Sequence, residues 1–157
     1  MIIEKELPLR LGVGIILLNN KNKVFVGKRI DNPKNYWQMP QGGSNKGENF
    51  YKAALRELKE ETSIVSVKLI KEINKKFTYI LPDHLIGIIW KGKFKGQKQK
   101  WYVVRFTGKE SEINIKTKHP EFLDWKWVDL DELPKIAVSF KTKVYKKVES
   151  EVKKILN

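Results

Sequence analysis

The sequence of 157 residues contains no cysteine. Disulfide frameworks, thiol nucleophiles, and zinc or iron–sulfur sites with cysteine ligands are therefore excluded. There are only two histidines, His84 and His119, and with no supporting motif around them they do not argue for a zinc site or an imidazole catalyst. We expect both histidines at the surface. A chain without cysteine is also compatible with a reducing cytoplasm, where we expect this protein to work.

Long hydrophobic runs are also missing. The longest apolar run, Val13 to Leu18, is far too short to cross a membrane. The segment Met1 to Leu11 carries several charged residues and lacks the uninterrupted apolar stretch of a signal peptide. We therefore expect a soluble protein with no membrane partner.

Acidic residues are scarce, with 18 Asp and Glu against 32 Lys and Arg, for a formal net charge of +14. This excess favours polyanionic partners such as nucleic acid or an anionic membrane through long-range attraction. Only four of the basic residues are arginines, so a generally lysine-rich composition explains the same charge. The charge by itself leaves both interpretations open.

The chain shows no internal repeat, low-complexity block or linker, which predicts one domain over residues 1–157. Helical spacing of apolar residues predicts amphipathic helices at Asn49 to Thr62 and Ser139 to Leu156. Most other apolar segments are short and β-rich, and the first two form a hairpin. These predicted strands are Val13 to Leu18, Lys23 to Arg29, Val65 to Ile73, Phe77 to Leu81, Leu85 to Trp90, Lys100 to Phe106 and Trp125 to Val128. The order predicts a layered α/β fold with a mixed sheet.

Three carboxylates lie close together on the first predicted helix. Glu57, Glu60 and Glu61 follow the spacing i, i+3, i+4, which places them on one helical face. Such crowding is unfavourable unless a cation or protons neutralise it, and oxygen ligands alone suit Mg²⁺ or Mn²⁺. The alternative is a solvated acidic face paired with neighbouring basic side chains.

The surrounding segment favours the metal site. A glycine-rich loop precedes the acidic helix, and the whole stretch from Gly42 to Ile64 resembles the Nudix box. The pattern is Gly42, five residues, Glu48, seven residues, and then the sequence RELKEETSI. One position departs from the box, because Ser63 stands where the family has glycine. That glycine serves the helix exit and does not bind metal.

Further motifs narrow the resemblance to the bacterial RNA pyrophosphohydrolases, a group once described as dinucleoside polyphosphate hydrolases. They cover the chain from about Arg10 to Lys147 in the family's order. These motifs are Trp37 to Gly43, Gly96 to Tyr102, Pro120 to Phe122, Trp125 to Val128, and Val138 to Lys141. The resemblance implies an α/β/α sandwich that hydrolyses phosphoric anhydride bonds with a divalent metal.

The resemblance also implies site residues. The expected metal ligands are Glu57, Glu60, Glu61, Glu121 and Gly42, and one of the four glutamates is the general base. Glu57 is our first choice as base.

Two further residues support these ligands. Arg56 can hold Glu60 one helical turn away, and Glu48 pairs within the loop.

For the RNA end, the resemblance points to a set of basic, aromatic and polar residues. They are Arg10, Arg29, Tyr79, Gln97, Val138, Ser139, Phe140 and Lys141. Guanidinium groups suit phosphate oxygens, and an aromatic ring such as Phe140 can stack on an exposed base. Core packing is the alternative for Phe140, because it also begins the apolar stripe of the last helix.

Three functions follow from this resemblance. The first is an RNA 5′ pyrophosphohydrolase that converts 5′-triphosphate or diphosphate ends to monophosphate and so starts RNA decay. The second is a hydrolase of diadenosine tetra- and pentaphosphate. The third is an inactive RNA-binding module of the same fold. The intact Glu57, Glu60 and Glu61 argue against this third function.

Overall fold

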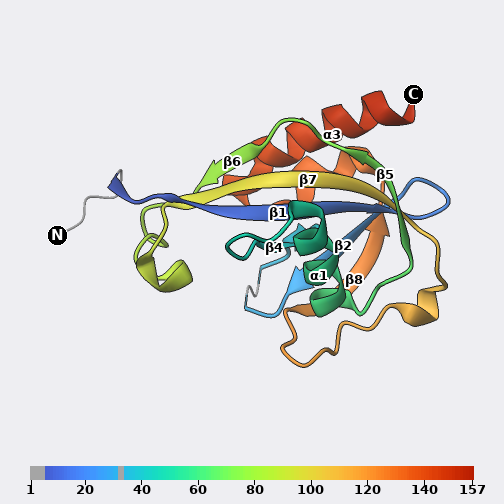
Figure 1. Ribbon diagram of the computed structural model, residues 1–157, viewed down its shortest axis with the longest axis horizontal. Helices are drawn as coiled ribbons and strands as arrows, with labels where there is room; N and C mark the ends of the chain where they lie inside the picture. Colours follow the sequence, from blue (N-terminus) through green and yellow to red (C-terminus); the bar gives the residue numbers. More distant parts are fainter. Residues whose placement is uncertain (1–5, 32–33) are drawn as a thin grey trace.

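The computed structural model describes residues 6–31 and 34–157. Within them the chain forms one mixed sheet and three α-helices (Figure 1). The strands are β1 (Leu9–Leu18), β2 (Val24–Arg29), β3 (Trp37–Gln38), β4 (Gln41–Gly43), β5 (Val67–Glu72), β6 (Phe77–Ile80), β7 (Gly96–Phe106) and β8 (Phe122–Val128). The helices are α1 (Phe50–Thr62), α2 (Leu133–Ile136) and α3 (Thr142–Leu156). None of the helices formed by these residues is long and apolar enough to span a membrane.

On one side, β1 pairs with two different strands along its length, and this arrangement positions the glycine-rich loop. β1 runs parallel to β7 over its whole length, whereas the other pairs are antiparallel. β1 meets β2 only at the hairpin, where Leu18 pairs with Val24. Nearer its start β1 pairs with β4 instead, with Gly12 opposite Gly43. The loop that precedes α1 is therefore fixed against the centre of the sheet.

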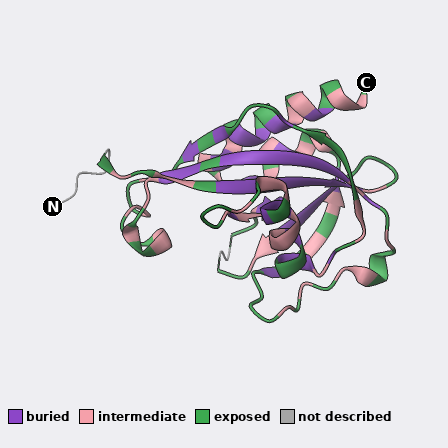
Figure 2. Cartoon of the chain, viewed as in Figure 1, coloured by how far each residue is buried: buried purple, intermediate pink, exposed green. Residues whose placement is uncertain are grey.

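Alternation of side chains along the strands separates two cores, one on each face of the sheet. On β1, Val13, Ile15 and Leu17 belong to the core that α1 covers, and Ile16 and Leu18 belong to the core that α3 covers. Figure 2 shows the central strands buried between these layers. Burying each large apolar side chain contributes about 1.5–3 kcal/mol, so both helices are held mainly by their apolar faces. The predicted α/β/α sandwich with a mixed sheet is confirmed.

One predicted strand is wrong. The segment Leu85 to Trp90 forms turns and then a 3₁₀ turn at Ile89–Gly92. Gly87 has a φ of 93°, which bends the chain away from extended geometry. Most of the apolar side chains that favour a strand instead pack against the α3 core from outside; they are Leu85, Ile86, Ile89 and Trp90.

The residue that caps the start of helix α1 suits its position, whereas the residue that ends the helix does not. The Asn49 side chain accepts a hydrogen bond from the Lys52 backbone and caps the first turn. Ser63 ends the helix in the left-handed region, with a φ of 67°. Glycine adopts this conformation without strain, which explains why the Nudix box has glycine there.

We expect Ser63→Gly to be more stable than Ser63→Ala by about 1 kcal/mol. Both variants lose the hydrogen bond that the Ser63 hydroxyl donates to the Asn114 carbonyl oxygen at 2.8 Å, so their difference isolates the backbone conformation. Urea unfolding measures it. Equal stability of the two variants would show that the left-handed conformation carries no strain here.

Candidate active site

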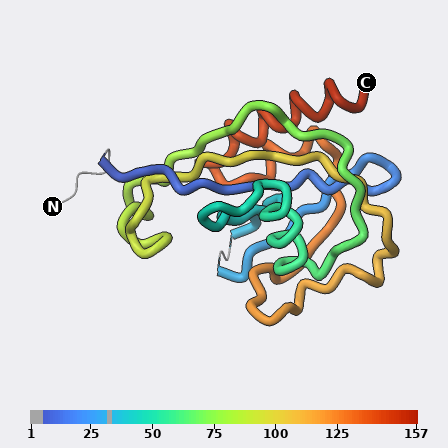
Figure 3. The backbone as a smooth tube through the Cα atoms, viewed as in Figure 1, coloured from blue at the N-terminus to red at the C-terminus, as the bar shows by residue number. Residues whose placement is uncertain are grey.

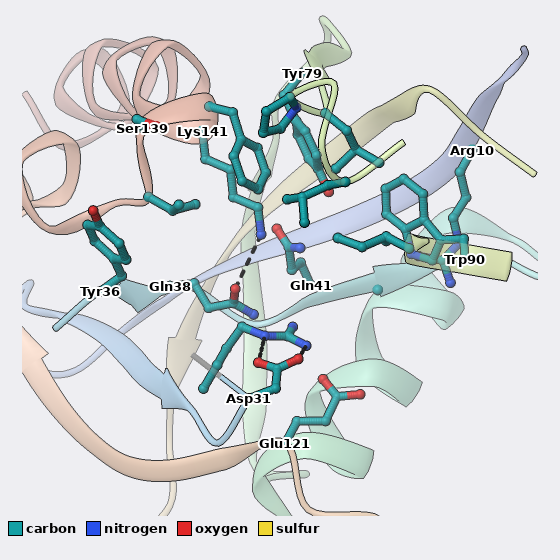
Figure 4. A pocket seen from close by; sticks show the side chains of 18 of the residues that line it. Arg10, Asp31, Tyr36, Gln38, Gln41, Tyr79, Trp90, Glu121, Ser139 and Lys141 are labelled. Atoms are coloured by element: carbon teal, nitrogen blue, oxygen red, sulfur yellow. Dashed lines mark hydrogen bonds and ion pairs between the residues drawn. The ribbon is translucent and has the colours of Figure 1, made fainter. Parts of the chain in front are cut away.

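A cavity of about 800 Å³ opens beside the glycine-rich loop. It lies between the second half of α1, the ends of β2 and β6, and the turn before α3. Figure 4 shows its side chains from close by. Most of the predicted site residues line it. They are Arg10, Arg29, Gly42, Glu57, Glu60, Tyr79, Glu121, Val138, Ser139, Phe140 and Lys141.

Glu57 is fixed against the loop. A Cβ atom at position 42 would overlap the Glu57 carboxyl group, so Gly42 leaves the space in which this side chain lies. The Glu57 side chain is 15% exposed. Burial raises the pKa of Glu57, with smaller contributions from Glu60 and Glu121, while Arg56 acts in the opposite direction. The loop therefore holds the Glu57 carboxylate, partly shielded from water, at the edge of the cavity.

Glu61 lies beneath the cavity wall. It is 2% exposed, and neither of its side-chain oxygens has a hydrogen-bond partner among the described residues. Burial raises the pKa of Glu61 well above its ordinary value, and the charges of Glu121 and Glu57 raise it further. The charge of Arg29 and the backbone amide of Gln41, which lacks the geometry of a full hydrogen bond, oppose this rise and do not cancel it. An unpaired buried carboxylate costs free energy unless it is protonated or meets a cation.

These acids fit a hard divalent cation. The oxygens of Glu61 lack hydrogen-bond partners among the described residues. The charge of Glu121 raises the pKa of both Glu57 and Glu61, and the charge of Glu57 raises that of Glu61 as well. In residues 6–31 and 34–157, however, no three acidic or imidazole side chains converge into a ready-made metal site. Such an open set suits Mg²⁺ or Mn²⁺, which keep water ligands and share substrate phosphates.

The predicted supporting contacts are present around Arg56. Its guanidinium group donates to both carboxylate oxygens of Glu48, at 2.9 and 3.0 Å, and to the carbonyl oxygen of Gly43 at 2.9 Å. It also donates to Glu57 at 2.9 Å and to Glu60 at 3.3 Å. Hydrogen bonding to Arg56 lowers the pKa of Glu48 to about 2. Arg56 therefore ties the glycine-rich loop to the acidic face of α1.

We expect Glu61→Gln to stabilise the metal-free protein, and the gain to grow as the pH rises above about 4.5. The pKa of Glu61 is raised in the folded state, so the folded protein holds this proton more tightly than the unfolded chain does. That contribution to stability is present at low pH and is lost as the pH rises through the folded pKa. Glutamine does not ionise and escapes the loss.

Thermal unfolding in a chelator at pH 5 and pH 8 measures this effect. Added Mg²⁺ should stabilise the wild type more than Glu61→Gln, because a ligand stabilises the state that binds it. A difference between the two proteins that is the same at both pH values would contradict the assigned burial.

Arg29 is held by a carboxylate that the sequence reasoning missed. Its Nε and Nη2 atoms donate to the two oxygens of Asp31, both at 2.7 Å, as the dashed lines in Figure 4 show. This hydrogen bonding lowers the pKa of Asp31 and raises that of Arg29. Asp31 follows Arg29 by two residues, and that spacing was the only sequence signal.

Lys141 lies among aromatic rings and amides. It is 6% exposed, and its Nζ atom donates to Gln38 Oε1 at 3.2 Å. The ring centroids of Tyr79 and Phe140 lie 5.4 and 5.9 Å from Nζ. Burial, followed by the charge of Arg29, lowers the pKa of Lys141 to about 7. The two rings lie 5.6 Å apart, so Phe140 both packs against the core and lines the cavity.

Gln97 lies beneath the cavity and is fully buried. Its Oε1 atom accepts hydrogen bonds from the Tyr79 hydroxyl at 3.2 Å and from Gln99 Nε2 at 2.8 Å. Its own Nε2 donates to the Gly42 carbonyl oxygen at 3.4 Å. In this structure Gln97 supports the wall of the site and does not reach into the cavity.

Sequence reasoning also missed Gln38 and Trp90 as lining residues. Gln38 is part of the quoted motif Trp37 to Gly43, so a signal for it was present. Trp90 was assigned to a strand, and only its long-range packing places it at the cavity.

The comparisons with known proteins identify a family. A family model described as the NUDIX domain matches residues 8–148. A curated protein from Pelagibacter ubique (strain HTCC1062), named RNA pyrophosphohydrolase, is 62% identical over 152 residues, which cover 97% of this chain and 96% of that protein. A protein of the same name from Orientia tsutsugamushi (strain Boryong) is 46% identical over 146 residues, covering 93% and 91% of the two chains.

Solved structures resemble the fold at low sequence identity. The dihydroneopterin triphosphate pyrophosphohydrolase of E. coli has a TM-score of 0.67 at 20% identity, and covers 89% of this chain and 96% of that one. A binary complex of the C. elegans Ap4A hydrolase has a TM-score of 0.62 at 18% identity, with coverage of 90% and 97%. At this identity the two structures support the fold alone.

Proposed function

The chain belongs to the NUDIX domain family, and on that premise we propose that it is an RNA pyrophosphohydrolase. It would hydrolyse a phosphoric anhydride bond at the 5′ end of triphosphorylated or diphosphorylated RNA and leave a 5′-monophosphate, the step that starts RNA decay. One observation carries the proposal. A single cavity has the carboxylates of Glu57, Glu60 and Glu121 on its wall together with the group Tyr79, Phe140 and Lys141. The acids suit the 5′ phosphates, through a bound metal, and the aromatic and basic side chains suit the first nucleotides of the RNA.

The acids would hold a divalent metal, for which Mg²⁺ is the first candidate. Nudix hydrolases use divalent metals, which neutralise phosphate charge and make a bound water more acidic. We assign the metal ligands to Glu57, Glu60, Glu61, Glu121 and the backbone of Gly42. Glu57 is the proposed general base, because its carboxyl group is fixed against Gly42 and its raised pKa brings it closer to neutral pH.

The remaining residues would bind the RNA end. Arg29 supplies a guanidinium group on the cavity wall, and Lys141 supplies an amine that a nearby phosphate would keep protonated. Phe140 supplies a ring on which a base can stack. Arg56 and Glu48 would act indirectly, since they fix the loop that carries Gly42 and Gly43. Gln97 would support this wall from beneath.

The test is hydrolysis of a short 5′-triphosphorylated RNA by the purified protein with Mg²⁺. We expect a 5′-monophosphorylated product, and no product when a chelator replaces the metal. Intact RNA after incubation with Mg²⁺ or Mn²⁺ would overturn the proposal and favour the inactive binding module. Activity in the chelator would overturn the metal site.

The same acids could serve a dinucleoside polyphosphate, so hydrolysis of diadenosine tetraphosphate remains the second candidate. The net charge of +14 and the Phe140–Lys141 pair favour RNA.

We further propose that residues 1–157 form one domain, whose Nudix box spans Gly42 to Ile64. We also propose that the protein works in the cytoplasm.

A further inference from the structure

Arg10 is held differently from the other arginine that lines the cavity. Arg29 is paired with Asp31, but among the described residues Arg10 has no ion pair with a carboxylate. Its guanidinium carbon lies 5.2 Å from the centre of the Trp90 ring. Within residues 6–31 and 34–157, the N–H donors of Arg10 therefore have no acidic partner, while an aromatic face contacts the group.

The glycine-rich loop confines the same guanidinium group from another direction. A Cβ atom at position 43 would overlap the Arg10 guanidinium, so Gly43 leaves the space that this group fills. Figure 4 shows Arg10 beside Trp90 on one side of the cavity, with Lys141 on another. Arg10 thus lies between the indole and the loop that places the Glu57 carboxyl group.

The backbone of Trp90 is strained in the position that makes this contact. Trp90 and Lys91 have φ values of 54° and 57°, a left-handed conformation that costs free energy for residues other than glycine. Strain of this kind persists where the surrounding structure fixes it, and it is concentrated at functional sites.

The segment 82–95 is also anchored to the strand that carries Arg10. The Lys95 amide donates to the Pro8 carbonyl oxygen at 3.1 Å, two residues before Arg10. Figure 3 shows this segment, in yellow-green, beside the start of β1. This hydrogen bond ties the segment to the start of β1, beside the strand residue whose guanidinium group the indole contacts.

We propose that Trp90 is a positioning residue for substrate binding, which holds the Arg10 guanidinium at the cavity wall to receive the phosphates of the RNA end. The inference rests on the proposed function and extends it. Arg10 contacts the substrate, and Trp90 acts through Arg10. Because the indole orders a group that must otherwise be ordered on binding, its loss weakens binding more than it slows the chemical step.

A double-mutant cycle tests this role. We expect Trp90→Leu to raise KM for triphosphorylated RNA by about three- to tenfold with kcat nearly unchanged. In the Arg10→Ala background the same substitution should change KM less than twofold. Trp90→Phe keeps an aromatic face and should lie between the wild type and Trp90→Leu. Ile88→Ala, in the same turn but 72% exposed and outside the cavity lining, should leave KM unchanged.

The outcomes separate this inference from the proposed function. An equal rise in KM in both backgrounds, or no rise in either, would overturn the role of Trp90 while RNA hydrolysis by the wild type stands. If Trp90→Leu does not fold, the cycle with Trp90→Phe decides by the same criterion. A wild type that does not cleave RNA would overturn the proposed function, and the inference with it.

Discussion

Replacing Glu57 with glutamine is expected to lower kcat on triphosphorylated RNA by about 10³-fold. Glutamine keeps the shape that fits against Gly42 but loses the negative charge and the ability to take a proton. The Arg56 contact survives through the amide oxygen, so the loop should stay in place. Single-turnover kinetics in Mg²⁺ measure the change at the chemical step.

A matched control is Glu151→Gln on α3, where the carboxylate pairs only with Lys154 among the described ion pairs and does not line the cavity. It should keep full activity. If Glu57→Gln keeps activity within tenfold of the wild type, Glu57 is not the base, and Glu60, Glu61 or Glu121 takes its place in the account.

Phe140→Ala is expected to lower kcat/KM on triphosphorylated RNA by about 10- to 100-fold, because base stacking on an aromatic ring contributes about 1–3 kcal/mol. The ring lies at the cavity wall beside Tyr79, 5.6 Å away, so a base can reach it there. Steady-state kinetics with a short RNA measure the effect.

Phe140→Leu separates stacking from packing. Leucine fills most of the space in the α3 core but offers no aromatic face. Stacking predicts that Phe140→Leu is nearly as impaired as Phe140→Ala while its thermal stability stays near that of the wild type. Full activity in Phe140→Leu would mean that Phe140 only packs.

The local parts of the site could be predicted from the sequence. Helical spacing determines that Glu57, Glu60 and Glu61 share a face, and the loop motif places Gly42 beside them. The contact between Arg56 and Glu60 also depends on spacing within one helix, and the structure has it at 3.3 Å. Such features are set by neighbouring residues along the chain.

The features of the site that could not be predicted from the sequence depend on contacts between distant segments. Nothing in the motif Gly96 to Tyr102 indicates that Gln97 is fully buried, since this follows from its position between β1 and β6 in the sheet. The apolar residues around Trp90 favour a strand by composition, whereas the structure forms a turn there that packs against the core from outside. Asp31 was overlooked because its importance depends on where Arg29 points.

RNA as the substrate is tested most directly by a competition between triphosphorylated RNA and diadenosine tetraphosphate in one reaction with Mg²⁺. The ratio of the two kcat/KM values measures which substrate the site prefers. We expect the wild type to consume RNA faster, and Phe140→Ala to reduce this preference. Faster consumption of the dinucleotide by the wild type would contradict this expectation.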